Sequence, residues 1–283
     1  MSTITIHVMH TGQVSVAPDL PFGGSETNIL KASGLFTKKE DRLWLPVSTY
    51  LIEHPKGLVL VDTGWHREMS PNGVFDKAAQ VKSLGSSLLY RINQGVLPHG
   101  QAVDEQLARM GIKPSDLDYV LLTHLDCDHA NGLSQVADAK KILASKTELE
   151  FTKKGLMNHI RYQEKWWKDV PVTFFNWNGS EGPVGKSYDV FGDGSLVCVN
   201  ILGHAEGMFA VKVRNAEGKF VLLYADGGYA SKSWQEMILP GVVDDKTALI
   251  HSLEWIREQS LDPNCLISLA NHDINIEPQM ITL

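Results

Sequence analysis

The stretch Thr123-His124-Leu125-Asp126-Cys127-Asp128-His129-Ala130-Asn131-Gly132 follows the apolar run Tyr119-Val120-Leu121-Leu122. An apolar run of this length is typical of a buried β-strand, so the polar residues after it should begin on a loop at the end of that strand. Two histidines and two aspartates fall within six residues there, and on a loop their side chains can converge on one ion. The same pattern also suits a helix N-cap beside a solvated loop, so this stretch alone leaves both interpretations open.

Three later apolar runs end in the same way, with a histidine or an aspartate directly after a predicted strand. They are Val197–Leu202 before Gly203-His204, Leu222–Ala225 before Asp226, and Leu266–Leu269 before Ala270-Asn271-His272. Four independent coincidences explain this repetition poorly. The repeated arrangement therefore favours one metal-binding site built from four separate segments.

A weak internal repeat predicts the architecture. Leu58-Val59-Leu60-Val61-Asp62-Thr63-Gly64 and Leu222-Leu223-Tyr224-Ala225-Asp226-Gly227-Gly228 each place four apolar residues before Asp-x-Gly. Glycine permits the sharp turn that follows each strand. Two related halves packed face to face would give an α/β (α+β) fold: a four-layer αββα sandwich of two mixed β-sheets flanked by helices, with the strand ends gathered along one rim.

The remaining segments fit one domain over residues 1–283. We expect strands at Thr3–Met9, Leu45–Ile52 and Leu58–Val61, a hairpin turn at Pro55-Lys56-Gly57, and an amphipathic helix over Val103–Met110. Residues 146–180 mix basic and aromatic side chains, which predicts a lid or insertion. Its aromatic residues suit either an apolar pocket or a contact between two copies in a homodimer, and the sequence does not choose.

Composition narrows the partners. The 283-residue chain carries 26 Lys and Arg against 33 Asp and Glu, a formal net charge of −7, which disfavours a surface that neutralises phosphates. No apolar window approaches the roughly 18 to 20 residues of a membrane-spanning helix, and residues 1–13 lack the features of a leader peptide. Three cysteines without a C-x-x-C pair fit a reducing compartment. We therefore expect a cytoplasmic protein with no nucleic-acid and no membrane partner.

These segments, with Leu45-Pro46-Val47 and the end of the strand at Asp62, resemble the metallo-β-lactamase fold, and within it the N-acyl-homoserine lactonase group. The resemblance spans Leu45 to His272 and is more specific for fold than for substrate. One position departs from the family, which usually has H-x-H-x-D-H where this chain has H-x-D-x-D-H, with Asp126 in place of the second histidine. A carboxylate is harder than imidazole and anionic, so Asp126 shifts the metal preference from zinc towards iron or manganese. The flavodiiron branch of the fold is similar, with a glutamate there and two irons.

The resemblance implies two divalent metal ions and a role for each residue at the site. By position, the first ion would be held by His124, Asp126 and His204, and the second by Asp128, His129 and His272, with Asp226 bridging them. Such a pair of ions lowers the pKa of a shared water enough to supply hydroxide at neutral pH and polarises a carbonyl. Asp128 would also orient the hydroxide and pass its proton to the leaving group. Tyr229 either donates a hydrogen bond to the developing oxyanion or simply packs at the rim.

The function that follows is a dinuclear metal-dependent hydrolase acting on a small-molecule ester or lactone, of which acyl-homoserine lactone is the example implied by resemblance. Two alternatives keep the metals and change the substrate, to a thioester as in the glyoxalase II branch or to a phosphodiester. A third, of another class, is a binding or sensing protein whose site has drifted at Asp126 and has lost catalysis. The substrate, the acyl-chain preference, the native metal and the oligomeric state are not fixed by the sequence.

Overall fold

A computed structural model describes residues 3–24 and 26–283, which form two β-sheets packed face to face. The larger sheet has the strand order β13-β1-β2-β3-β5-β6-β7, with β4 paired to β1. Its strands are β1 (Thr5–Val16), β2 (Leu43–His54), β3 (Gly57–Val61), β4 (Gln94–Val96), β5 (Tyr119–Leu121), β6 (Ile142–Ser145), β7 (Val172–Phe175) and β13 (Gln279–Thr282). The strands from β3 to β7 are parallel and the others antiparallel, so this sheet is mixed.

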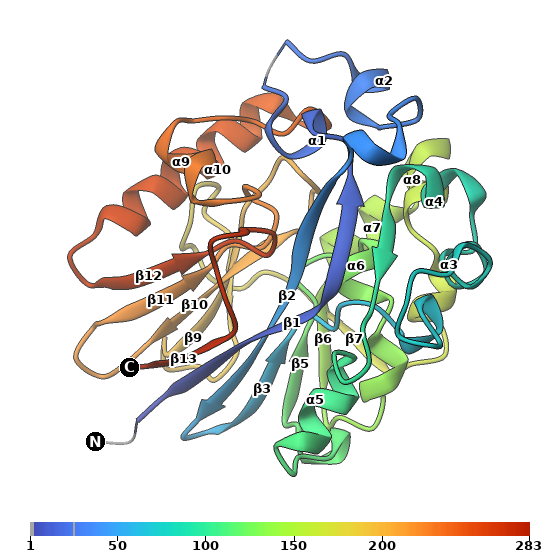
Figure 1. Cartoon of the computed structure of the whole chain (residues 1–283). Helices are drawn as coiled ribbons and strands as arrows, with labels where there is room; N and C mark the ends of the chain where they lie inside the picture. Colours follow the sequence, from blue (N-terminus) through green and yellow to red (C-terminus); the bar gives the residue numbers. More distant parts are fainter. Residues whose placement is uncertain (1–2, 25) are drawn as a thin grey trace.

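The smaller sheet has the order β12-β11-β10-β9-β8 and is also mixed, because only β11 and β12 run parallel. Its strands are β8 (Ser187–Asp189), β9 (Leu196–Asn200), β10 (Phe209–Arg214), β11 (Phe220–Leu223) and β12 (Cys265–Leu269). In Figure 1, α9 and α10 cover the outside of this sheet, while α3, α5 and α7 lie on the side of the larger one. The predicted four-layer αββα arrangement of two mixed sheets is therefore confirmed.

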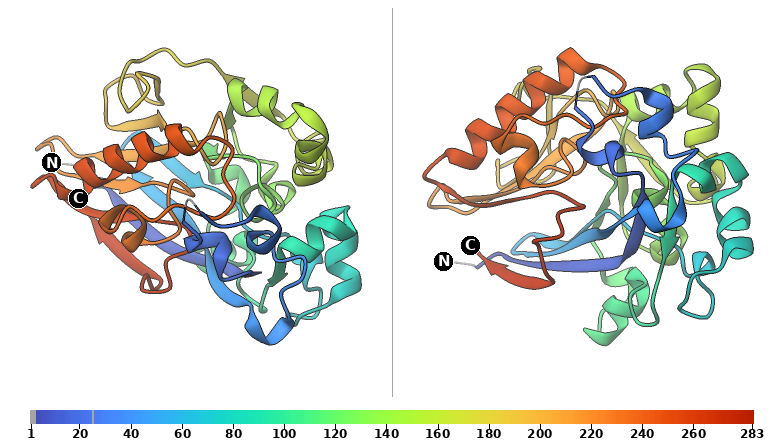
Figure 2. Two further views of the ribbon diagram at one scale, coloured as in Figure 1. Left: turned by 90° about the horizontal axis from the view of Figure 1, so that it is seen from above. Right: turned by 45° about the horizontal axis from the view of Figure 1, so that its top comes forward.

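Helices connect the strands and close the upper end of the sandwich. The α-helices are α1 (Asp19–Phe22), α2 (Ile29–Ala32), α3 (Lys77–Leu84), α4 (Ser87–Ile92), α5 (Val103–Arg109), α6 (Cys127–Ala130), α7 (Lys146–Thr152), α8 (Gly155–Arg161), α9 (Ser231–Gln235) and α10 (Lys246–Leu261). Short 3₁₀ turns are η1 (Lys39–Asp41), η2 (Arg67–Met69), η3 (Pro114–Asp116), η4 (Leu133–Val136) and η5 (Glu164–Trp166). Figures 1 and 2 show α1 and α2 at the upper end of the sandwich. No helix in the described part of the chain is long and apolar enough to cross a membrane.

The alternation of side chains along the strands explains the layers. In β2 and β3, Ile52 and Val59 join the core between the two sheets, whereas Leu51 and Leu60 join the core under the helices. All four are fully buried. Successive side chains of a strand point to opposite faces, so strands that are covered on both faces need apolar residues throughout.

The predicted strands and the helix near Val103 are present, with one informative extension. The first strand continues beyond Met9 to Val16 across a register shift between His10 and Gln13, where Gly12 has a φ of 86°. The polar residues at this bulge interrupt the apolar pattern, which is why the second half of the strand is not visible in the sequence.

Residues 146–180 form α7, α8, η5 and β7, and β7 is the parallel edge strand of the larger sheet. The aromatic side chains of this stretch largely pack inward: Trp166 and Trp167 are each only 5% exposed, and Trp166 Nε1 donates a hydrogen bond to the carbonyl oxygen of Ser83 at 3.1 Å. These two indoles therefore pack in the interior and are too buried to form a surface for substrate or for a second copy of the chain.

Candidate metal centre

All the sequence-predicted site residues meet at the rim where β5, β9, β11 and β12 end. Asp126, Asp128 and His129 lie on or directly before α6, and His124 lies between β5 and that helix. The other residues follow the ends of strands in the smaller sheet: His204 after β9, Asp226 and Tyr229 after β11, and His272 after β12. The candidate metal and catalytic side chains are buried, which is unusual for so many ionisable groups.

The first set of ligand atoms comprises His124, His204 and Asp226, which lie within 4.8 Å of one another. Asp126 Oδ2 lies 3.3 Å from His124 Nε2 and 2.9 Å from His204 Nε2. Ligand bonds of about 2.0–2.2 Å place neighbouring tetrahedral ligands about 3.3–3.6 Å apart. Asp126 is thus adjacent to this set, although its carboxylate also has another partner, described below.

The second set comprises Asp128, His129 and His272. His272 Nε2 lies 3.5 Å from Asp128 Oδ2 and 3.3 Å from Asp226 Oδ1, and His129 Nε2 lies 3.4 Å from the same Asp226 oxygen. Asp226 Oδ2 points instead towards His204 Nε2, at 3.7 Å. The two oxygens of one carboxylate therefore face the two sets, which is the arrangement a bridging ligand needs.

The donor atoms of the two sets are better suited to binding a cation than to hydrogen-bonding with one another. His124 Nε2, His129 Nε2 and Asp226 Oδ1 are buried without a hydrogen-bond partner. Buried polar atoms are nearly always paired, so orphaned atoms that converge on one point call for a ligand. Nitrogen from neutral imidazole and oxygen from carboxylate are donors that divalent zinc, iron and manganese all accept.

The buried charges of the site shift the pKa values of Asp226 and His129 in opposite directions. Although burial favours the neutral carboxyl, His272 and His129 hold the pKa of Asp226 well below its ordinary value. Burial alone would lower the pKa of His129, but Asp226 and Asp62 raise it well above the ordinary value. Without a metal, positive charge on His129 and His272 stabilises the Asp226 carboxylate; a metal ion would replace that charge and release the protons.

Three histidines are oriented through Nδ1, which leaves Nε2 directed into the site. His129 Nδ1 lies 2.9 Å from Asp62 Oδ2, His272 Nδ1 lies 2.8 Å from the carbonyl oxygen of Pro46, and His124 Nδ1 lies 3.0 Å from the Thr123 hydroxyl. Such partners fix the tautomer and the ring orientation of metal-binding histidines. Asp62 also accepts hydrogen bonds from the backbone and hydroxyl of Thr123, both at 2.8 Å, so it holds two parts of the motif at once.

Backbone geometry at the strand ends is unusual in both halves of the fold. Asp62, after β3, has a φ of 59°, and Ala225, directly before Asp226, has a φ of 45°. Residues other than glycine rarely occupy this region, and they do so where the surrounding structure enforces it, often at functional sites. Gly203, before His204, has a φ of 127° and lies against Leu249 of α10, where an added Cβ would be 2.3 Å from the Leu249 Cβ.

Glu148 connects two of the ligand-bearing loops. Its carboxylate accepts hydrogen bonds from the backbone N–H groups of Leu125, at 3.2 Å, and Gly207, at 3.0 Å. Burial raises the pKa of Glu148 to about 7. This side chain therefore ties the motif loop to the loop that carries His204.

Arg161, the last residue of α8, was not predicted and is the main addition to the site. Its Nε donates to Asp126 Oδ1 at 2.6 Å and its Nη2 donates to Asp126 Oδ2 at 2.5 Å. The same guanidinium contacts His204, with Nη2 at 2.8 Å from Nε2 and Nη1 at 3.2 Å from the carbonyl oxygen. In the sequence, Arg161 is one basic residue among several in an aromatic-rich stretch, so only the tertiary structure reveals its position.

A cavity of about 300 Å³ opens over the centre. Asp126, Asp128, His204, Asp226 and Tyr229 line its polar end. Most of its other lining residues are aliphatic: Val14, Val16, Leu20, Ile29, Leu89, Ile92, Met157, Ile160, Val242 and Val243. None of the tryptophans of the 146–180 stretch is among the residues that line this cavity. Its apolar wall comes from the second half of β1, from α1, α2, α4 and α8, and from the segment before α10.

Tyr229 lies beside both sets of ligands. Its ring stacks on His272, with 5.2 Å between centroids, and approaches His204 edge-on at 6.4 Å. Burial raises the pKa of its phenol well above the ordinary value, so the group stays protonated and able to donate a hydrogen bond.

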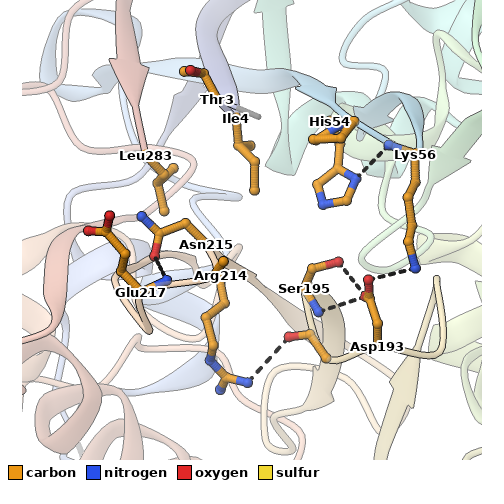
Figure 3. Close-up of a pocket in the computed structure, with 13 residues that line it drawn as sticks. Thr3, Ile4, His54, Lys56, Asp193, Ser195, Arg214, Asn215, Glu217 and Leu283 are labelled. Carbon is orange, nitrogen blue, oxygen red and sulfur yellow. Dashed lines mark hydrogen bonds and ion pairs between the residues drawn. The ribbon is translucent and has the colours of Figure 1, made fainter. Parts of the chain in front are cut away.

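A second cavity, of about 580 Å³, lies at the end of the sandwich near the C-terminus (Figure 3). Three of its charged residues have partners: Lys56 Nζ lies 2.6 Å from an oxygen of Asp193, and Arg214 Nη1 donates to the carbonyl oxygen of Gly194 at 3.3 Å. No set of potential metal ligands among the described residues lies there. The rim that carries the histidines is therefore the candidate functional site.

Residues 42–155, which include the motif loop and four of the seven predicted metal ligands, match the family model of the metallo-beta-lactamase superfamily. This part of the chain is therefore similar to the metallo-beta-lactamase superfamily. Over 218 residues it is 29% identical to the N-acyl homoserine lactonase AttM of Rhizobium radiobacter, covering 75% of this chain and 76% of the relative. It is also 25% identical over 242 residues to an N-acyl homoserine lactonase of Bacillus cereus, covering 82% and 83%.

Solved structures superimpose on nearly the whole chain. An N-acyl homoserine lactone hydrolase, solved with N-hexanoyl-L-homoserine as product at its catalytic metal center, matches with a TM-score of 0.72 at 20% identity. The match covers 97% of this chain and 95% of that one. At this level of identity, the likeness confirms the metallo-β-lactamase fold.

Proposed function

We propose that this protein is a metal-dependent hydrolase that uses two divalent ions to open a lactone, or a related ester, of the acyl-homoserine-lactone type. The observation that carries the proposal is the convergence of four histidines and two aspartates from four segments into two adjoining groups of buried donor atoms, with Asp126 Oδ2 beside the first group. His124 Nε2, His129 Nε2 and Asp226 Oδ1 have no hydrogen-bond partner there. The names of the AttM-type relatives support the choice of a lactone over the thioester and phosphodiester alternatives.

The proposed ligand sets differ from the two groups of donor atoms in two respects: Asp126 joins the first group, and Asp226 is shared by both. His124, Asp126 and His204 would hold the first ion, and Asp128, His129 and His272 the second, with Asp226 shared between them. The division of the two Asp226 oxygens between the sets supports the shared role. The oxygen of Asp126 adds a hard donor, so iron and manganese are candidates beside zinc.

Ions bound here would polarise the substrate carbonyl and acidify water for attack at neutral pH. The residues of the chain then supply proton transfer and positioning. Asp128 is buried at the polar end of the cavity, where its carboxylate can accept a proton from the attacking water and deliver it to the leaving alkoxide. A lactone needs both steps, because opening the ring releases an alcohol and a carboxylate from one molecule.

Tyr229 is the second proposed catalytic residue. Its protonated phenol lies over the centre, against His272, and can donate a hydrogen bond to the oxyanion that develops on the attacked carbonyl. A donor placed in advance, in a site largely shielded from water, stabilises this charge more effectively than water does.

The aliphatic wall of the cavity supports a substrate with a small apolar substituent, such as a short acyl chain. The polar groups lie at one end and the aliphatic side chains around the rest, so the reactive ring and the apolar tail would be separated within one pocket. Exposed apolar residues continue outward at the mouth, including Ile29 and Met157.

The test is turnover of a panel of lactone, thioester and bis-aryl phosphate substrates by the protein loaded with zinc, iron or manganese. We expect the lactones to be hydrolysed, and His204→Ala and Asp226→Ala to lower kcat/KM for them at least a hundredfold. His251→Ala, on the exposed face of α10, serves as the control and should leave the rate unchanged. Equal rates for the parent and the two site variants would refute the proposal.

The proposal also covers the cellular location, the oligomeric state and a lid over the cavity. The unpaired state of Cys127, Cys198 and Cys265 supports a cytoplasmic location, where thiols stay reduced. Exposed apolar side chains on α2 and α8 support a homodimer, because a second copy would cover them. Residues 146–180 would act as a lid that closes the cavity through α8.

A further inference from the structure

We propose that Arg161 is a positioning residue that allows Asp126 to serve as a ligand of the first ion, by cancelling the charge of that carboxylate and fixing its orientation. This inference rests on the two-ion site proposed above. It answers a question raised by the sequence: how a buried centre accommodates a third carboxylate where a neutral imidazole would suffice.

The first step is the geometry of the pair. The guanidinium binds the Asp126 carboxylate through two parallel hydrogen bonds, one to each oxygen, and its Nη2 also lies 2.8 Å from His204 Nε2. This bidentate arrangement fixes the plane of the carboxylate as well as its position. Asp126 Oδ2, held in this way, lies between His124 Nε2 and His204 Nε2, at 3.3 and 2.9 Å.

The second step is the charge of the site. Three aspartates line it, and with neutral histidines they contribute three negative charges. A histidine at position 126 would leave two negative charges. The positive charge of Arg161 offsets the additional negative charge of Asp126. Asp126 and Arg161 together therefore present the same net charge to an ion as one neutral imidazole. The pair differs from imidazole in donor type, oxygen instead of nitrogen, and not in charge.

The third step is that Arg161 depends on Asp126. Asp126 is the carboxylate with which it forms an ion pair within the described residues. Its remaining hydrogen bonds go to His204, and its guanidinium also stacks on the buried ring of Tyr162 at 4.9 Å. If residue 126 lost its charge, a largely enclosed cation would remain beside the first ion without a counter-charge, and the two positive charges would repel each other.

The family motif alone would predict that a histidine at position 126 improves metal binding, and the dependence of Arg161 on Asp126 predicts the opposite. Asp126→His restores the usual family motif, yet in this chain it should weaken the first site, because Arg161 is still there. In an Arg161→Gln background the same change should be nearly neutral. A structural role for either residue alone would not produce this coupling.

The experiment measures zinc bound per chain at graded free zinc concentrations in a chelator buffer, by plasma mass spectrometry. The four proteins are the parent, Asp126→His, Arg161→Gln and the double variant. We expect two zinc ions on the parent. Asp126→His should weaken the binding of one ion at least tenfold in the parent background and less than threefold in the Arg161→Gln background. The ion at Asp128, His129 and His272 should be retained in all four, which confirms that each protein is folded.

Two further variants sharpen the test. Asp126→Asn keeps the shape of the side chain, removes its charge, and should show the same background dependence if Asp126→His does not fold. Lys154→Gln removes the ion pair between the start of α8 and Glu206 and should leave both zinc affinities unchanged.

The inference is overturned if Asp126→His binds two zinc ions as tightly as the parent, if it loses one equally in both backgrounds, or if the parent itself binds only one. A parent that binds two zinc ions and shows the predicted coupling, but hydrolyses no lactone, would count against the proposed function alone.

Discussion

Asp62 and His129 are joined by a fully buried contact of 2.9 Å between Oδ2 and Nδ1, which leaves His129 Nε2 directed at Asp226. The two residues are 67 positions apart in the chain and follow neighbouring parallel strands, β3 and β5. The carboxyl ends of parallel strands meet at one edge of a sheet, so a strand that holds no metal ligand can still orient the ligand of its neighbour.

Removing the charge of Asp62 should therefore weaken the second ion without removing any ligand. We expect Asp62→Asn to lower zinc affinity about 10–100-fold, because the amide neither fixes the His129 tautomer nor raises its basicity in the same way. Chelator competition measures the effect. Asp118→Asn, at a half-buried carboxylate that accepts a hydrogen bond from the backbone of Leu58, is the control and should leave zinc affinity unchanged. An unchanged zinc affinity for Asp62→Asn would contradict this role.

Tyr229→Phe separates catalysis from metal binding. The variant keeps the ring that stacks on His272 and loses the phenol donor, so we expect kcat on a lactone to fall about 10–1000-fold. KM and zinc content should change little. A variant with the parental kcat would show that Tyr229 only packs at the rim.

Gly203→Ala should be strongly destabilising. The new Cβ would lie 2.3 Å from the Leu249 Cβ, and the φ of 127° is unfavourable for alanine. We expect a loss of about 2–4 kcal/mol in the free energy of unfolding, measured by denaturant titration. Gly218→Ala is a matched control with a φ of 84° and open space around the added Cβ, so it should cost only about 1 kcal/mol. Similar losses for the two variants would argue against a close approach of the His204 loop to α10.

Glu148 predicts a pH dependence of stability in the metal-free protein. Burial raises its pKa to about 7, from 4.5 in the unfolded chain, so the folded state binds a proton more tightly. The resulting stability is complete below pH 4.5 and is lost as the pH rises through 7, by about 3 kcal/mol in total at roughly 1.4 kcal/mol per pH unit.

The measurement is urea unfolding between pH 4.5 and pH 8 in the presence of a chelator. Glu148→Gln should flatten this pH dependence, although it is less stable at low pH because its amide cannot accept hydrogen bonds from both Leu125 and Gly207. A slope in the parent that persists unchanged in the variant would assign the dependence to other groups.

The sequence predicted most of the fold because its strands are buried on both faces and therefore contain continuous apolar runs. The residues of the candidate site were also predictable, since each of the four segments that contribute them follows such a run. The strand before Asp226 is the partial exception: β11 covers Phe220–Leu223, two residues earlier than the apolar run, because Ala225 adopts a positive φ and ends the pairing. Apolar side chains alone do not mark where a backbone turns.

Arg161 could not be predicted in the same way. Its partner Asp126 is 35 residues distant, and α8 has no pattern that distinguishes the last residue from the other basic residues nearby. The aliphatic wall of the cavity was likewise hidden, because its residues come from short helices scattered between positions 20 and 243 and from the second half of β1.

The most direct test of the central claim is the metal content of the protein purified without chelator or added metal, measured by plasma mass spectrometry together with lactone turnover of the same sample. We expect close to two divalent ions per chain, with both ions and turnover reduced in parallel in His204→Ala and Asp226→Ala. One ion or none, persisting after reconstitution with zinc, iron or manganese and without lactone turnover, would contradict it and favour a binding protein without catalysis.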